Sequence, residues 1–177
     1  MKELERTFLA REIPHGLKNS RSKEIIDIYI PKSRQHPTLR IRKNGDTLEI
    51  TKKEPVKGND SSIQYEHTIN LDKEEFDTLN GLDGKRLHKI RYYYTYNGRI
   101  IEIDVFQGAL KGLIMIDVEF DSEEEKDSFE MPEFCLADVT QEKFSAGGML
   151  CGKSYDDIEN DLGRFGYKKL IISDGHE

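Results

Sequence analysis

The sequence has little cysteine and no long apolar run. Cys135 and Cys151 are its two cysteines among 177 residues, and they give neither a disulfide framework nor a metal-binding spacing. No apolar run reaches the roughly 20 residues that a membrane-spanning helix needs. The N-terminus also lacks the basic-then-apolar pattern of a secretory signal. We therefore expect a protein of the reducing cytoplasm that does not contact a membrane.

An excess of positive charge is lacking as well. The chain carries 27 Lys and Arg against 34 Asp and Glu, and this net charge of −7 argues against a nucleic-acid partner. The five histidines show no metal-ligand spacing. Hydrophobic residues make up only 36%, yet eight Phe, eight Tyr and many Ile and Leu fall in short regular runs. The composition predicts one folded, very polar domain over residues 1–170 and a flexible tail over 171–177.

Strand-like segments dominate the chain. Eight of them alternate in polarity or are rich in β-branched and aromatic residues. They are residues 3–10, 24–31, 38–45, 46–53, 62–71, 85–98, 99–108 and 113–120. Asn-Gly pairs at 44–45 and 97–98 are strong hairpin signals between consecutive segments. The pattern predicts about eight strands, mostly with antiparallel neighbours.

Three segments have helix-capping residues or helical spacing. They are residues 71–81 with Asp72 as N-cap, 121–132 with Ser122, and 153–167 with Ser154. Gly81 and Pro132 mark the expected ends of the first two helices. These helices are available to cover an apolar sheet face. The stretch 53–62, rich in Lys, Pro, Gly, Asn and Ser, predicts a flexible loop.

Charged residues share one face of several strands, because strand side chains alternate with a period of two. The acidic pairs are Glu3/Glu5, Glu102/Asp104 and Asp117/Glu119, and the basic pairs are Arg40/Arg42 and Lys89/Arg91. An ordinary antiparallel sheet also turns a charged face to water. The sorting of acids and bases onto different strands instead favours a closed sheet whose charged faces point inward. Such a sheet would form a polar tunnel.

A tunnel of this kind suits one class of ligand. Clustered Arg and Lys bind phosphate oxygens, and Arg adds fork-shaped hydrogen bonds. Clustered carboxylates would repel a polyanion unless hard divalent cations lie between them, which points to Mg²⁺ or Mn²⁺. Acids, metal and phosphate together are the arrangement that phosphoryl transfer requires.

The motifs resemble those of the CYTH, or triphosphate tunnel metalloenzyme, superfamily. They are ELE at 3–5, TLRIR at 38–42, HKIRY at 88–92, IEIDVFQGALKGL at 101–113 and IDVEF at 116–120. The resemblance implies an α+β, mainly β fold, in which an eight-stranded antiparallel barrel forms a tunnel with surrounding helices. It also implies hydrolysis or cyclisation of triphosphate compounds with Mg²⁺ or Mn²⁺.

The resemblance assigns roles to twelve residues of this sequence. As metal ligands it implies Glu3, Glu5, Asp104, Asp117 and Glu119. As phosphate-binding residues it implies Arg40, Arg42, Lys53, Lys89, Arg91 and Lys143. As catalytic residues we expect Glu66, Asp117 and Lys89. Three positions depart from the family pattern: Thr7 and Phe144 stand where a base is usual, and Gln64 where an acid is usual. Each departure is expected to remove a charge from the tunnel.

These features predict a metal-dependent triphosphatase that acts on inorganic triphosphate or a related small organic triphosphate. A class IV adenylyl cyclase and a thiamine triphosphatase are alternatives within the family. Either would need a pocket for an organic group, which the sequence does not locate. A non-catalytic polyphosphate- or nucleotide-binding protein is an alternative of another class, and the three neutral substitutions support it. The sequence leaves the oligomeric state open, with a homodimer among the expectations.

Overall fold

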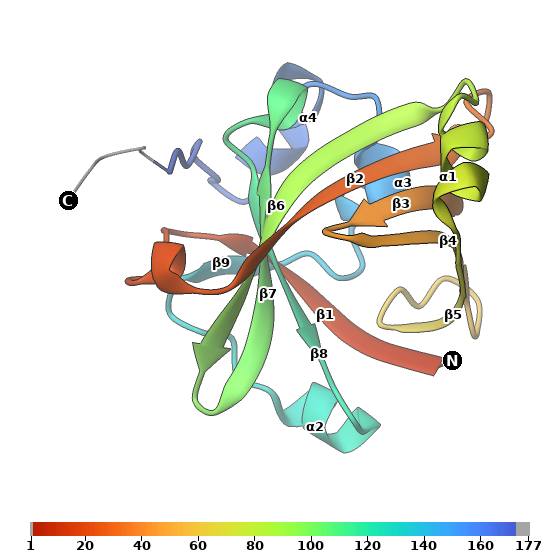
Figure 1. Ribbon diagram of the computed structural model, residues 1–177. Helices are drawn as coiled ribbons and strands as arrows, with labels where there is room; N and C mark the ends of the chain where they lie inside the picture. The colour runs from red at the N-terminus through yellow and green to blue at the C-terminus, as the bar shows by residue number, and fades with distance from the viewer. Residues whose placement is uncertain (1, 173–177) are drawn as a thin grey trace.

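The computed structural model describes residues 2–172, and its strands close into a barrel (Figure 1). The barrel strands are β1 (Lys2–Ala10), β2 (Ser22–Ile30), β3 (Leu39–Asn44), β4 (Thr47–Pro55), β5 (Ile63–Asn70), β6 (Lys85–Tyr96), β7 (Arg99–Phe106) and β8 (Ile114–Glu119). They run antiparallel in the order β5-β4-β3-β2-β6-β7-β8-β1, and a pairing of β5 with β1 completes the circle. The predicted mainly β fold with an eight-stranded antiparallel barrel is confirmed.

Strand β1 closes the barrel wall. Its start pairs with β5, where Glu3 lies opposite Gln64, and its middle pairs with β8, where Glu5 lies opposite Glu119. Its end pairs with a ninth strand, β9 (Cys135–Asp138), which the sequence pattern does not predict. Four residues place only two side chains on each face, so β9 has no readable alternation.

The two Asn-Gly pairs lie at tight hairpins, as predicted. Asn97 (φ 49°) and Gly98 (φ 79°) are both left-handed and join β6 to β7 in two residues, the pattern of a type I′ turn. In the other hairpin Asn44 still pairs with Thr47, so the loop is Gly45–Asp46, with φ 60° at Gly45. Left-handed backbone at these positions is available to Gly at no steric cost.

Apolar side chains close one end of the barrel interior. On the inward face of β1, the polar residues Glu5 and Thr7 are followed by Leu9, and β6, β7 and β8 change from charged to apolar in the same way. These side chains pack with the C-terminal part of the chain in one buried cluster. Its members include Leu9, Leu87, Phe106, Met115, Phe144, Leu150, Ile158 and Leu162. The interior is therefore a polar chamber with an apolar floor.

A second apolar cluster covers the outer face of β1, β7 and β8. Outward-facing Ile103 and Ile116 are fully buried there, together with Phe8. The segment around Phe129 and Phe134 packs over them. The two cysteines are free thiols, and one is buried in each cluster.

The helices and turns are short. They are α1 (Lys73–Asn80), α2 (Glu123–Ser128), α3 (Gly147–Leu150) and α4 (Tyr155–Gly163), with 3-10 turns η1 (Leu17–Asn19), η2 (Gly108–Leu110) and η3 (Lys143–Ser145). The predicted N-caps Asp72, Ser122 and Ser154 each accept a hydrogen bond from the backbone N–H three residues later. Helix α2 ends before Pro132, because Phe129 leaves the helical conformation and joins the outer apolar cluster.

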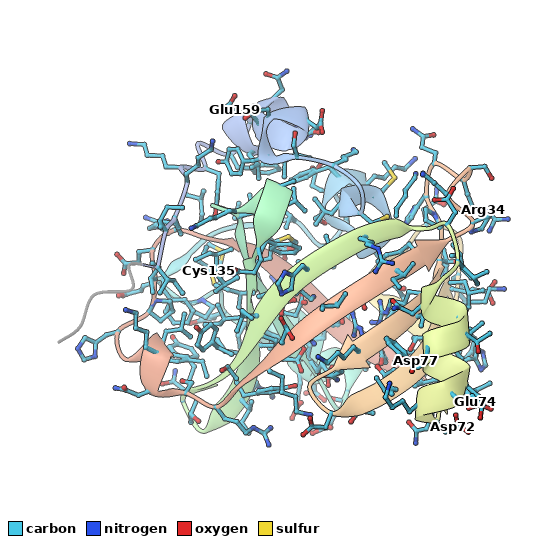
Figure 2. All side chains as sticks on the ribbon, turned by 45° about the horizontal axis from the view of Figure 1, so that its top comes forward. Arg34, Asp72, Glu74, Asp77, Cys135 and Glu159 are labelled. Carbon is cyan, nitrogen blue, oxygen red and sulfur yellow. The ribbon has the colours of Figure 1, made fainter. Side chains whose placement is uncertain are left out.

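One of the three predicted helices covers the barrel as expected. Helix α4 buries Tyr155, Ile158 and Leu162 against the floor, whereas α1 and α2 bury none of their residues. Glu74 and Asp77, two acidic residues of α1 that Figure 2 labels, are exposed. Of the three helices that the sequence makes available to cover the sheet, α1 and α2 do not bury a side chain on it, because their side chains are mostly charged or polar.

Two predicted boundaries differ from those of the structure. Strand β4 continues to Pro55, so the predicted loop at 53–62 is restricted to residues 56–62. In the predicted tail, Ile172 packs partly buried against the outer apolar cluster, and residues 173–177 lie outside the described part of the chain. Within residues 2–172, no helix has the length and apolar character needed to cross a membrane.

Candidate active site

Inward-facing side chains from all eight barrel strands line one cavity of about 440 Å³. Every residue that the sequence predicts for the site lies on its wall. These residues are Glu3, Glu5, Arg40, Arg42, Lys53, Glu66, Lys89, Arg91, Asp104, Asp117, Glu119 and Lys143. All but Lys143 lie on strands, and Lys143 begins η3. The barrel thus brings together residues that are far apart in the sequence.

The exposure and the charge of the side chains change with depth in the chamber. Asp27 and Asp104 expose only 1% and 2% of their side chains, and Arg42 and Lys89 expose 9% each. Glu5 of β1 exposes 24%. The inner part therefore consists of cations with bound acids, and the outer part is rich in carboxylates.

A bidentate ion pair lies in the inner part. Arg42 Nε donates to Asp27 Oδ1 at 2.6 Å, and its terminal nitrogen donates to Oδ2 at 2.8 Å. Burial alone would raise the pKa of Asp27, but Arg42 and then Arg40 outweigh it and hold that pKa below its ordinary value. Burial would likewise lower the pKa of Arg42, yet Asp27 raises it. Both groups are therefore charged.

A second buried acid holds two cations. Asp104 accepts two hydrogen bonds of 2.7 Å from Arg91 and one from Lys89. These cations overcome the effect of burial and hold the pKa of Asp104 well below its ordinary value. Burial, and then the neighbouring Arg91, lower the pKa of Lys89 despite its contact with Asp104. Arg91 also contacts Glu102 and lies 3.3 Å from Asp117 Oδ2, so it links the inner cations to the outer acids.

Like charges face each other in the outer part. Glu5 lies opposite Glu119, and Glu102 lies opposite Asp117 in the strand register. Directly opposed carboxylates are destabilising without a counter-ion. Burial, followed by Glu5 and Asp104, raises the pKa of Asp117 to about 7. Burial and the surrounding glutamates also raise the pKa of Glu119.

Lys53 stands among these acids. Its Nζ lies 2.6 Å from Glu3 Oε2 and 3.5 Å from carboxylate oxygens of Glu5 and Glu66. Burial would lower its pKa, but Glu5 and the other acids raise it. Glu3 Oε2 is buried, and the angles of its approach to Lys53 do not make a hydrogen bond. One ammonium group thus lies beside three carboxylates, of which Glu66 also contacts Arg40.

The outer acids have the right chemistry for a hard divalent cation. Carboxylate oxygens are the ligands that Mg²⁺ and Mn²⁺ prefer. Among the described residues, no three acidic, histidine or cysteine side chains already surround a common metal position. The opposed pairs of acids, with three carboxylates around the single ammonium of Lys53, nevertheless leave a deficit of positive charge there. The donor set therefore fits Mg²⁺ or Mn²⁺.

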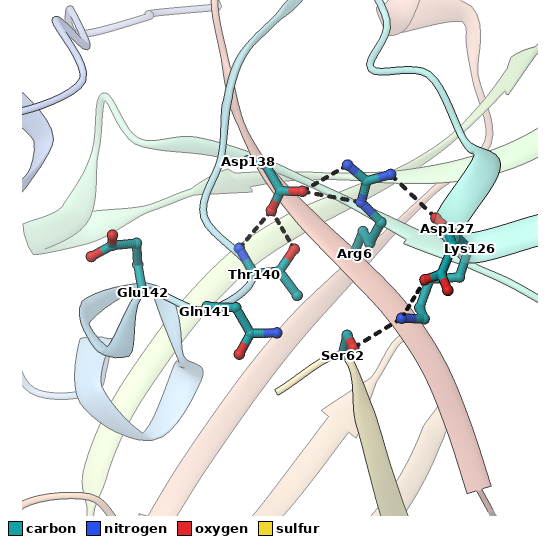
Figure 3. Close-up of a pocket in the computed structure, with 8 residues that line it drawn as sticks. All are labelled: Arg6, Ser62, Lys126, Asp127, Asp138, Thr140, Gln141 and Glu142. Atoms are coloured by element: carbon teal, nitrogen blue, oxygen red, sulfur yellow. Dashed lines mark hydrogen bonds and ion pairs between the residues drawn. The ribbon is translucent and has the colours of Figure 1, made fainter. Parts of the chain in front are cut away.

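A second cavity, of about 420 Å³, lies outside the barrel wall (Figure 3). Its two cations are engaged by protein groups. Arg6 donates to Asp138 and to the backbone oxygens of Lys126 and Phe129, and Lys126 donates to Ser62. The chamber inside the barrel, with a buried Arg40 Nε that has no hydrogen-bond partner, is the better candidate for a ligand site.

Comparison with known proteins identifies the family. The model of the CYTH domain matches residues 1–145. The chain belongs to the CYTH domain family. A relative described as an inorganic triphosphatase, from Nitrosomonas europaea, is 32% identical over 145 residues, which cover 81% of this chain and 92% of the relative.

Solved structures agree with this assignment. The crystal structure of an inorganic triphosphatase matches with a TM-score of 0.62 at 26% identity, over 85% of this chain and 95% of that one. A structure described as a putative adenylate cyclase, from Bacillus halodurans, matches with a TM-score of 0.51 at 18% identity, over 98% of this chain and 95% of that one. At that identity the second likeness shows the CYTH fold alone.

The three departures from the CYTH pattern have different structural outcomes. Thr7 Oγ1 donates a 2.7 Å hydrogen bond to Asp117, and the amide of Gln64 donates to the backbone oxygen of Ser61. Both residues line the chamber and are neutral there. Phe144 is instead buried in the apolar floor. The prediction that it removes a charge from the tunnel is therefore wrong, because η3 turns this side chain out of the CYTH chamber.

Sequence reasoning missed several residues on the chamber and its inner ion pairs. They are Asp27, Tyr29, Asn44, Glu49 and Glu142. Asp27 carries a readable signal, since it is a single acid in the otherwise apolar stretch Ile25–Ile30. Glu49 and Glu142 carry no such signal, because in sequence they look the same as the exposed acids of other strands and turns.

Proposed function

We propose that this chain is a divalent-metal-dependent triphosphatase that hydrolyses inorganic triphosphate or a related small triphosphate inside the barrel. The observation that carries the proposal is the division of the chamber into buried cations and an outer set of opposed carboxylates. A polyphosphate chain and a divalent cation together neutralise both halves. The similarity to a relative described as an inorganic triphosphatase supports the same reaction.

The cations would hold the phosphate groups. Arg40 has a buried Nε–H with no hydrogen-bond partner, so it can donate to a phosphate oxygen without breaking a hydrogen bond. Charge-assisted hydrogen bonds of this kind are about twice as strong as neutral ones. The full proposed set is Arg40, Arg42, Lys53, Lys89, Arg91 and Lys143. In the inner part of the chamber, where Arg42 and Lys89 expose 9% of their side chains, these charges stabilise a transferring phosphoryl group more than they would in solution.

The outer acids would hold the metal. Of the two roles that the sequence gives Asp117, the general base fits better, so we assign Glu3, Glu5 and Glu119 as ligands of Mg²⁺ or Mn²⁺, and Asp104 supports them from its place beside Arg91. When bound, such a cation neutralises the phosphate chain and polarises a phosphoryl oxygen. In exchange for the metal, Lys53 would leave Glu3 and turn toward the phosphates. This exchange would replace the single positive charge of Lys53 with the double charge of the cation.

Asp117 is the better candidate for the general base. Water attacks the terminal phosphorus, its proton passes to a carboxylate, and the bond to the leaving pyrophosphate oxygen breaks. A base works best when its pKa lies near the working pH, and in the metal-free chamber burial, Glu5 and Asp104 raise the pKa of Asp117 to about 7. Glu66 is the second candidate, but Lys53 and Arg40 overcome burial and lower its pKa. Lys89 would stabilise charge on the phosphoryl group.

Two features of the chain bear on its compartment and its partners. Buried free thiols at Cys135 and Cys151 suit a reducing cytoplasm. The net charge of −7 makes nucleic acid an unfavourable partner. Whether the protein is a monomer or a homodimer is measured directly by light scattering.

A substrate panel tests the proposed function. Inorganic triphosphate, ATP and thiamine triphosphate are each supplied with Mg²⁺ or Mn²⁺, and the products are identified. We expect phosphate and pyrophosphate from inorganic triphosphate, at a rate that EDTA abolishes. Cyclic AMP from ATP would establish the cyclase instead, and preferred cleavage of thiamine triphosphate would establish the thiamine triphosphatase.

One observation favours a non-catalytic binder. The neutral residues Thr7 and Gln64 reduce the charge of the chamber wall where the family pattern has charged groups. Tight calorimetric binding of triphosphate, with no product formed in either metal, would establish that function and refute the triphosphatase.

A further inference from the structure

Asp27 is the single acid in the otherwise apolar stretch Ile25–Ile30 of β2. It lies on the inward face of β2 between Ile25 and Tyr29, and its side chain exposes 1% of its surface. An acid so deeply buried is unfavourable unless it is paired and hydrogen-bonded. Its cross-strand neighbour in the β2–β3 register is Arg42.

The two neighbouring arginines of β3 differ in how they are held. Arg42 donates from two nitrogens to the two oxygens of Asp27, at 2.6 and 2.8 Å. Arg40 makes longer contacts, 3.3 Å to Tyr29 Oη and 3.5 Å to Glu66, and its Nε lies 4.0 Å from Asp27. A fork-shaped pair fixes both the position and the plane of a guanidinium. Arg42 is therefore locked, and Arg40 is free to follow a ligand.

The ion pair with Asp27 uses only some of the N–H donors of Arg42. A guanidinium has five N–H donors, of which Asp27 takes two. The remaining three are held on a fixed plane at the wall of the chamber. Donors that do not need to reorganise stabilise a transition state better than mobile ones. Asp27 also removes one unit of positive charge from the inner part, where bound phosphate would otherwise be held most tightly.

We propose that Asp27 is a positioning residue that orients Arg42 for phosphoryl transfer and limits the ground-state binding of phosphate anions. This inference rests on the proposed triphosphatase function. It concerns a residue that touches Arg42 and not the substrate. Its consequence is a division of labour in which Arg40 supplies adaptable binding and Arg42 supplies fixed stabilisation of the transition state.

The variant Asp27→Asn tests the proposal, because it keeps the shape of the side chain and removes its charge. Arg42 then loses one of its two hydrogen bonds and its counter-ion. We expect kcat per folded molecule to fall about 10- to 100-fold, while KM stays within about threefold or falls. Inhibition by inorganic phosphate should become stronger. An unchanged kcat, or a loss that appears entirely as a raised KM, would overturn the proposal.

Ile28→Ala is the matched control. Ile28 is the next residue of β2, points to the outside of the barrel and exposes 1% of its surface. Its truncation should destabilise the fold and leave kcat per folded molecule unchanged. If Ile28→Ala lowers kcat as much as Asp27→Asn does, Asp27 acts only through stability and the proposal fails.

The double variant Asp27→Asn/Arg42→Gln separates this inference from the proposed function. Thermal unfolding should show Asp27→Asn less stable than wild type, with part of the loss recovered in the double variant, since the unpaired buried charge is gone. No recovery would show that Asp27 does not act on Arg42. If wild type releases no phosphate from triphosphate, the proposed function fails, whatever the thermal unfolding of these variants shows.

Discussion

At the scale of single residues, Asp117 is the acid whose charge the fold tolerates least. Burial, Glu5 and Asp104 raise its pKa to about 7, from 3.8 in an unfolded chain. Between these values the folded state binds the proton more tightly, so stability falls as pH rises through this range, and the loss is complete above the folded pKa. Asp117→Asn should therefore raise the free energy of unfolding at about pH 8, by at most about 4 kcal/mol. Urea unfolding in EDTA measures this.

The pH dependence is the control for that prediction. Near pH 4 and below, wild-type Asp117 is protonated in the folded state, so Asp117→Asn should give little gain there. A gain of the same size at both pH values would mean that the substitution acts through packing or hydrogen bonding. The account of the outer acids would then be wrong, because it attributes the raised pKa to burial and to facing carboxylates.

The sequence predicts which residues face the chamber better than it predicts their partners. The period of two places Glu5, Arg42 and Asp117 inward as soon as the strands are recognised. Partners depend on which strands become neighbours. Asp104 resembles a metal ligand in the motif, but the β6–β7 register puts Arg91 directly opposite it. Asp27 was missed for the same reason, since its role emerges only when β3 lies beside β2.

At the scale of elements, the segment η3–α4 forms the floor of the chamber. Phe144 is buried in this floor and packs against Phe165. Phe144→Ala should lower the free energy of unfolding by about 3–5 kcal/mol, the usual loss for a buried Phe. Phe76→Ala in α1, a helix that buries no residue, should lower it by much less. Thermal unfolding of both variants makes the comparison, and an equal loss would contradict the assignment of the floor.

The same elements explain why secondary structure was only partly predictable. Strong alternation and Asn-Gly turns identify all eight barrel strands. Capping residues place the starts of α1, α2 and α4, because a cap is a local interaction. Coverage of the barrel is a tertiary property. All three helices have a capping residue, so capping does not show which of them covers the barrel. Of the three, only α4 buries side chains in the floor, and the acidic helices α1 and α2 bury none.

At the scale of the whole molecule, closure of the barrel turns separate charged strand faces into one chamber. The floor closes the inner end, so a phosphate chain would enter from the acid-rich part and reach the cations last. No single strand carries this arrangement. It requires the pairing of β5 with β1, which joins the first strand of the sequence to the fifth.

Release of phosphate from inorganic triphosphate is the most direct test of this account. Wild type, Glu5→Gln and the matched control Glu74→Gln, an exposed acid of α1, are assayed with Mg²⁺, with Mn²⁺ and with EDTA. We predict metal-dependent turnover by wild type and Glu74→Gln, and a rate at least about 100-fold lower for Glu5→Gln at unchanged folding. Equal phosphate release by wild type and Glu5→Gln would contradict the claim that the chamber is where the reaction occurs.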